Sequence, residues 1–217
     1  MDNITKKISK ILDSDPVLKQ ALQRNIINKR ALSIYIIKEH NLNYEVNAVI
    51  SALRRYEIDN EKIVDYKNAI DVISSGVLSS KNGIVSITLK KDSLSEKFLS
   101  KIFEIVEIEK NQSLRIVQAN EAIKIIIDKN NLERLKKLIP QNRIIRVDEN
   151  LAEIIIHLDK RTWSTPGVAA ILTTELSLNN INILEIISCM PEIIIFFKEE
   201  DIMNAYSVIY KIRNNKK

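Results

Sequence analysis

The feature that most constrains the fold is an order of strand and helix patterns after residue 83 that occurs twice. A strand pattern at 84–89 precedes a helix pattern at 94–105, strands at 114–119 and 122–127, a helix at 132–139 and a strand at 143–147. This βαββαβ order predicts a ferredoxin-like module. The order begins again with a strand at 151–158, a helix at 168–178, strands at 181–187 and 192–197, and a helix at 202–212.

The second copy has no fourth strand, so a neighbouring segment or another protomer must cover that edge of its sheet. Isoleucine fills successive positions at 125–127, 154–156 and 193–195, which predicts strands that are buried on both faces. Helices cover only one face of a ferredoxin-like sheet. Something apolar must cover the other face, either the second repeat or a dimer partner, and on this ground we expect a homodimer.

The first sixty residues have a helical pattern instead. Asp15 followed by Pro16 marks the start of a helix, and Asn28 and Asn43 are candidate caps of two more. The last two helices, joined by a short turn, resemble a helix-turn-helix unit. We therefore expect an α+β protein with a helical, helix-turn-helix-like domain at 1–60, a linker or helix at 61–82 ending in a turn at 81–83, and two ferredoxin-like repeats at 83–148 and 149–217.

Composition excludes several classes of protein. The single cysteine, Cys189, excludes an internal disulfide framework, and its position between two strands predicts a buried structural residue. No segment approaches the roughly 18 apolar residues of a membrane span. The N-terminus has no signal sequence, so we expect a cytoplasmic protein without membrane contact. A net charge of +5 hints only weakly at nucleic acid, because lysine is abundant throughout the chain.

The sequence contains none of the residue patterns that commonly indicate an active site. Three glycines in the whole chain cannot form a phosphate-binding glycine-rich loop. The two histidines, His40 and His157, lack partners at metal-ligand spacing, and no nucleophile set is recognisable. The sequence therefore predicts no enzyme, no metal and no cofactor.

The segment Ser164-Thr165-Pro166-Gly167 lies between a strand and a helix. Pro and Gly together fix a turn there and leave the first amides of the helix open to a carboxylate. Such a turn is suited to holding a small molecule, although it is equally consistent with a stable turn that binds nothing.

The second repeat contains an Ile-rich strand, Ser-Thr-Pro-Gly-Val, a helix, and Asn-Ile-Asn-Ile before the next strand. In these features it resembles the ACT domains, most closely the tandem pair in the regulatory tail of aspartokinases. The whole layout is similar to uncharacterised archaeal ACT-domain proteins. The first repeat matches mainly by strand order and has Lys90-Lys91-Asp92 where Pro-Gly would stand, so its own site is expected to be degenerate.

This resemblance implies an amino-acid effector bound between the strand-to-helix loop of one module and the second strand of its partner. A carboxylate would meet the amides after Pro166, and Asp159 or the Asn182 side chain would take an ammonium. The implied ligand-binding positions are Asp159, Thr162, Trp163, Ser164, Thr165, Pro166, Gly167, Val168, Asn182 and Ile183.

The helix around residues 46–55 offers a second kind of interface. Its outward residues are of the types that read base edges, and basic residues nearby suit phosphates. Its arginines also suit the C-terminal end of a helix dipole without any partner. The candidate nucleic-acid-binding residues are Lys29, Arg30, Tyr44, Asn47, Ser51, Arg54 and Arg55.

Together these observations predict a non-enzymatic regulator that senses an amino acid or similar metabolite and signals through its N-terminal domain to DNA or to a protein. The alternatives are a scaffold or adaptor whose ACT-like repeats only assemble, and a regulatory subunit of a separate enzyme.

Overall fold

The computed structural model describes residues 4–56, 66–92, 98–99, 101–104, 106 and 112–214. The chain divides into two compact units, Met1–Val64 and Asp65–Lys217, which we name the helical unit and the sheet unit. No helix among the described residues is long and apolar enough to cross a membrane.

The described part of the helical unit contains α1 (Ile4–Ser14), α2 (Pro16–Gln23), α3 (Lys29–Glu39) and α4 (Val46–Arg55). Two predicted caps are confirmed: Asp15 accepts hydrogen bonds from the first turn of α2, and Asn28 from that of α3. The Asn43 cap is wrong, because α4 begins after Glu45 without a side-chain cap. The helices enclose a core of Ile8, Leu12, Leu22, Leu32, Ile36, Leu42, Val49, Ala52 and Leu53.

The sheet unit begins with α5 (Tyr66–Ser75), and its described strands form one antiparallel sheet of order β2-β3-β1-β4-β6-β5. The strands are β1 (Val77–Lys90), β2 (Leu114–Gln118), β3 (Ala122–Asp128), β4 (Ile144–His157), β5 (Glu185–Cys189) and β6 (Glu192–Lys198). The helices are η3 (Lys129–Asn131), α7 (Leu132–Leu138), η4 (Gln141–Arg143), η5 (Lys160–Ser164), α8 (Val168–Leu178), η6 (Glu199–Asp201) and α9 (Ile202–Asn214). Much of the predicted helix at 94–105 lies outside the described residues, but 98–99 and 101–104 are helical.

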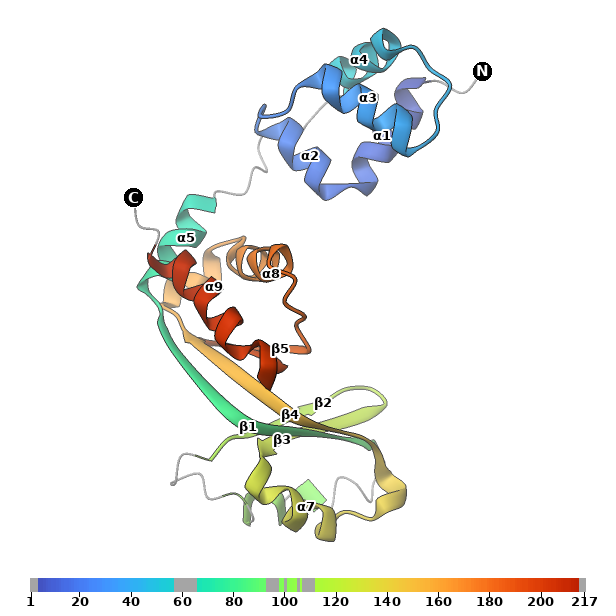
Figure 1. The fold of residues 1–217 in the computed structure, drawn as a ribbon. Helices are drawn as coiled ribbons and strands as arrows, with labels where there is room; N and C mark the ends of the chain where they lie inside the picture. Colours follow the sequence, from blue (N-terminus) through green and yellow to red (C-terminus); the bar gives the residue numbers. More distant parts are fainter. Residues whose placement is uncertain are drawn as a thin grey trace. The chain divides into compact units, whose positions relative to one another are not determined.

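The two predicted repeats share their long strands (Figure 1). The second part of β1 pairs with β3 and with the first part of β4, whereas residues 77–81 of β1 pair with residues 153–157 of β4. Residues 77–81 therefore supply the fourth strand that the second repeat lacks, as one of the two alternatives predicted. Of the two alternatives for 61–82, the helix is confirmed at residues 66–75, where α5 forms. Because α5 packs on α8 and α9, residues 66–81 belong to the sheet unit and are not a linker; residues 61–65 lie outside the described part.

The predicted turn at 81–83 is also wrong, since β1 continues through it. The register with β4 shifts between Lys81 and Ile84, and Gly83 has a φ of 70°. Asn150, at the corresponding place in β4, has a φ of 57°. A residue in the left-handed region is typical of a β-bulge, which bends and twists the strand that contains it. Both long strands thus bend where one half of the sheet passes into the other.

The helices of the two halves cover opposite parts of the sheet (Figure 1). One core lies between α7 and residues such as Ile87 and Ile125, and another lies between α8, α9 and residues such as Ile154 and Ile195. The helix-free faces meet in a third cluster formed by Ile84, Ile126, Leu151, Ile194 and Phe196. The chain itself therefore covers part of the helix-free face of each half, so the isoleucine runs alone do not require a dimer partner.

Candidate ligand-binding sites

The predicted loop of the second repeat forms a 3-10 turn whose polar groups mostly bond to one another. Asp159 accepts hydrogen bonds from the Arg161 backbone N–H at 2.6 Å and from its guanidinium at 2.7 Å. These bonds lower the pKa of Asp159, the backbone bond contributing most. The Thr162 and Thr165 hydroxyls donate to backbone carbonyls of the same turn, and Ser164 donates more weakly at 3.3 Å. Asp159 is therefore less available for a ligand ammonium than the sequence suggested.

The start of α8 remains open. Gly167 adopts a left-handed φ of 95° and caps the helix without a side-chain hydrogen bond. The N–H groups of Val168, Ala169 and Ala170 donate no hydrogen bond to an acceptor among the described residues. These amides carry the partial positive charge of a helix N-terminus, which attracts a carboxylate.

The two parts of the predicted site do not meet within the chain. Arg161 and residues 164–166 line a cavity of about 290 Å³ against α5, together with Asn68, Asp71 and Val72. Asn182 is exposed in the loop before β5, and Ile183 lines a different cavity. Trp163 is 74% exposed and reaches neither cavity. A ligand that contacts both the loop and residues 182–183 would need a second copy of the module.

The cavity that Ile183 lines measures about 410 Å³ and lies between the helix-free face of the first half and the start of β5. We call it the sheet cavity. The lining residues come from β1, β3 and β4 of the first half and from the β5–β6 region of the second. They are Ser86, Thr88, Lys124, Ile126, Arg146, Asp148, Leu151, Ile183, Leu184, Glu185 and Phe196.

The sheet cavity contains two ion pairs and a buried hydroxyl. Lys124 is paired with Glu185, which joins the two halves. Arg146 donates from Nε and Nη2 to Asp148 at 2.8 and 2.6 Å, and this bonding raises the pKa of Arg146. Ser86 is 5% exposed, and its hydroxyl has no hydrogen-bond partner among the described residues. A buried polar group without a partner is unusual and calls for an explanation.

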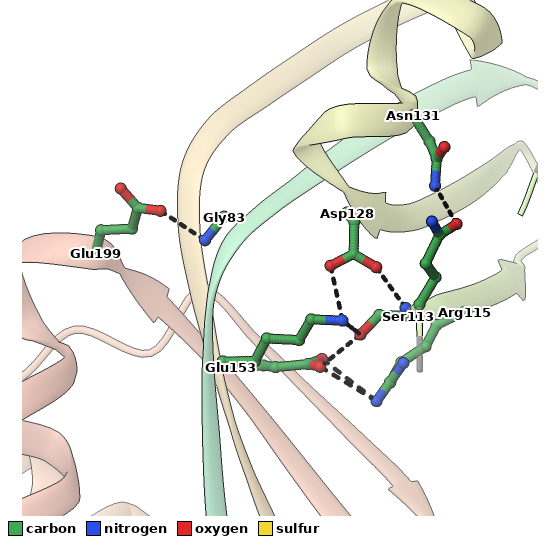
Figure 2. A network of polar contacts seen from close by, with 9 residues as sticks. Gly83, Ser113, Arg115, Asp128, Asn131, Glu153 and Glu199 are labelled. Carbon is green, nitrogen blue, oxygen red and sulfur yellow. Dashed lines mark hydrogen bonds and ion pairs between the residues drawn. The ribbon is translucent and has the colours of Figure 1, made fainter. Parts of the chain in front are cut away.

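A second cavity of about 350 Å³ lies on the helix-free face of the other half, where Glu153 is fully buried. Figure 2 shows its polar network. The Ser113 hydroxyl donates to Glu153 at 2.9 Å, and the Arg115 guanidinium lies 3.4 Å from the same carboxylate. Lys81 pairs with Asp128 at 2.7 Å. Burial raises the pKa of Glu153, and Arg115 opposes that change most strongly.

Sequence reasoning missed Ser86, Lys124, Arg146 and Glu153. The available signal was a polar residue inside an Ile-rich strand: Ser86 in IVSITLK, Lys124 in AIKIIID and Glu153 in LAEIIIH. Such residues usually lie on the solvent-exposed face of a strand. Here they mark a face on which two halves of one sheet meet.

In the helical unit, the candidate nucleic-acid-binding residues Arg30, Asn47, Arg54 and Arg55 are exposed, while Lys29 and Ser51 are half-buried. Tyr44 does not face outward as predicted. It packs against the helical core, with the Lys7 ammonium 5.9 Å from the centre of its ring.

The remaining reactive residues form no further site in the described part. Cys189 is exposed at the end of β5, so its predicted burial is wrong. His157 is exposed and lies 3.7 Å from Glu192. The described residues contain no group of three His, Cys, Asp or Glu side chains that could hold a metal ion.

The fold is similar to solved structures. An aspartate kinase from Clostridium acetobutylicum aligns with 63% of this chain and 34% of its own, at 22% identity and a TM-score of 0.50. A putative C-terminal regulatory domain of aspartate kinase from Porphyromonas gingivalis W83 aligns with 64% of this chain and 98% of its own, at 20% identity and a TM-score of 0.49. No protein-family model and no curated protein matches the chain. The chain thus spans about a third of the Clostridium kinase, and at 22% identity the likeness concerns the fold alone.

Proposed function

We propose that the sheet unit is a non-enzymatic regulatory module that binds an α-amino acid or a similar small metabolite. The observation that carries this proposal is the open N-terminus of α8, where the first-turn amides after Gly167 have no acceptor among the described residues. The ligand carboxylate binds these amides, and the loop residues 159–168 surround it. The resemblance of the two repeats to ACT domains and the fold shared with an aspartate kinase support the same class of function.

A charge substitution tests this site. Ala169 is exposed in the first turn of α8, so Ala169→Glu places a carboxylate beside the open amides and stabilises the helix dipole. The matched control, Ala169→Gln, has the same shape without the charge. Thermal unfolding of the full chain with each of the common amino acids should reveal a stabilising ligand for the unaltered chain and for Ala169→Gln. Ala169→Glu should unfold at a temperature no lower than that of the unaltered chain, but the added amino acid should no longer stabilise it. An equal response in both variants would exclude the α8 amides.

We also propose that the sheet unit forms a homodimer that brings Asn182 and Ile183 of one copy to the loop of the other. β5 is an outer strand of the sheet, and the apolar side chains of Leu184, directly before β5, and of Ile186, on β5, are exposed. An apolar edge strand favours association. Light scattering should give twice the chain mass, and Ile186→Lys should give a monomer. A monomeric unaltered chain would exclude this arrangement.

For the helical unit, we propose a role as the output, either to DNA or to a protein. Arg54 and Arg55 are exposed side by side at the end of α4, which suits phosphate contacts. Binding to random duplex DNA should weaken steeply with salt and disappear in Arg54→Ala with Arg55→Ala.

The adaptor alternative has an observation of its own. Val17, Ile26, Ile34 and Tyr35 are exposed on the helical unit, and an apolar cavity of about 310 Å³ lies between Leu18, Ile27, Ala31, Leu32 and Tyr35. Exposed apolar patches mark protein interaction sites. This alternative would be favoured if the chain did not bind DNA even at low salt and if no amino acid stabilised it against thermal unfolding.

A further inference from the structure

We propose that the sheet cavity is a separate binding site, which takes the carboxylate of a small aliphatic acid. This inference goes beyond the proposed function, because the site lies on the sheet of the first half and does not use the amides of α8. It shares only Ile183 with the positions that the sequence indicated.

The strand register places its polar side chains together. Thr88 on β1 pairs with Lys124 on β3 and with Arg146 on β4, so two cations flank one hydroxyl on the same face of the sheet. Ser86 lies two residues earlier on the same face, between Ile126 and Asp148. Because three strands hold these positions, the donors are arranged before any ligand arrives, which lowers the entropic cost of binding.

The hydrogen-bonding capacity of this face is not used up by the protein. Lys124 has three donors and bonds to Glu185, and the Nη1 of Arg146 makes no hydrogen bond among the described residues. The Ser86 hydroxyl is buried without a partner. Burial of an unpartnered hydroxyl costs free energy that a ligand oxygen would recover. The Lys124 ammonium and the Nη1 of Arg146 can only donate, which suits an anionic group of the ligand.

The other half of the sheet shows how a carboxylate fits at this depth. Ser86 and Glu153 occupy the same position in β1 and β4, and the last seven positions of the two strands have the same pattern of burial. The Glu153 carboxylate accepts a hydrogen bond from the Ser113 hydroxyl and forms an ion pair with the Arg115 guanidinium (Figure 2). The second half thus supplies its own carboxylate at the position where the first half has only the short hydroxyl side chain of Ser86.

The remaining walls determine the rest of the ligand. Ile126, Leu151, Ile183 and Phe196 line the sheet cavity with apolar surface, which favours a short aliphatic tail. Isocaproate, 2-oxoisocaproate and leucine have the same carbon skeleton and carboxylate. They differ only at the α-carbon, where the ammonium of leucine could reach Asp148 or Glu185. These three compounds therefore separate a fatty acid, a 2-oxo acid and an amino acid as the source of the carboxylate.

Calorimetric titration of the full chain with the three acids tests the site. We expect at least one of them to bind, and the neutral isocaproamide to bind much more weakly. Lys124→Met and Arg146→Gln should each lower the affinity about tenfold or more, since each removes a hydrogen bond to a charged group. Ser86→Glu should abolish binding, because its carboxylate, at the position that Glu153 has in β4, would occupy the donors that the ligand carboxylate needs. Lys136→Met is the control, since this lysine pairs with Glu133 on α7 and is similarly exposed.

Arg146 provides the variant least able to disturb folding, because its side chain is 70% exposed. No binding by any of the three acids, or equal binding by the unaltered chain, Arg146→Gln and Ser86→Glu, would overturn the proposal. Ala169→Glu separates this site from the amides of α8. Binding that is lost in Ala169→Glu but kept in Arg146→Gln excludes the sheet cavity and supports the proposed function, and the reverse result excludes the α8 site alone.

Discussion

The Glu199 carboxylate accepts a hydrogen bond of 2.7 Å from the backbone N–H of Gly83, although the two residues lie in different repeats. Gly83 is the left-handed residue of the bulge in β1, and Glu199 begins η6 directly after β6. Lys129, which directly follows β3, donates to Asn150 at the bulge of β4 at 3.3 Å. A residue of the second repeat therefore bonds to the bulge in β1, and a residue of the first repeat bonds to the bulge in β4.

We expect Glu199→Ala to destabilise the sheet unit by about 1–2 kcal/mol, because a hydrogen bond to a charged group is lost and a backbone donor loses its acceptor. Urea unfolding followed by circular dichroism measures the change. Glu200→Ala is the control, since the side chain of this neighbouring residue is exposed and has no hydrogen bond within the described part of the chain. Equal stability of the two variants would show that the bond does not hold the bulge.

Gly83→Asn should be tolerated much better than Gly83→Val. An added Cβ meets no described atom within 4 Å, so space does not limit either change. The φ of 70° does, because a β-branched residue is strained in the left-handed region whereas Asn adopts it readily, as Asn150 does. We expect the two variants to differ by about 1–2 kcal/mol in the free energy of unfolding. A difference near zero would mean that the bulge relaxes.

The buried Glu153 predicts an unusual dependence of stability on pH. Its folded-state pKa is raised above the ordinary value of 4.5, chiefly by burial. Between these two pKa values the folded state binds more protons than the unfolded state, so the stability from this group is complete below pH 4.5 and is lost as the pH rises through the folded pKa. Unfolding measured over this range should show Glu153→Gln gaining stability relative to the unaltered chain as the pH rises. A constant difference would contradict the raised pKa.

Phe196→Ala tests the cluster in which the helix-free faces meet. Phe196 is 1% exposed and packs with residues of both halves. Loss of its ring leaves a cavity, and we expect about 3–5 kcal/mol of destabilisation. Ile186→Ala on the outer strand β5 is the control, because that side chain is 41% exposed and should cost far less. A small effect of Phe196→Ala would show that the two faces can separate without loss of stability.

Local pattern was enough to predict much of this protein. The periods of the apolar residues indicated the helices and the strand order of both repeats, since side chains repeat every 3.6 residues in a helix and every two in a strand. Asp15 and Asn28 were found as caps because a cap acts on the residues next to it. The sequence also showed one strand pattern fewer in the second repeat than in the first.

The pairing of distant segments could be decided only by the tertiary structure. Residues 77–81 read as the end of a linker, but they complete a sheet whose other strands come much later in the chain. Ser86, Lys124 and Arg146 are ordinary strand residues by themselves, and they become neighbours only through the register of β1, β3 and β4. Hydrophobic period determines which face of a strand is buried, whereas the location of a shared cavity depends on which faces meet, and no local pattern contains that information.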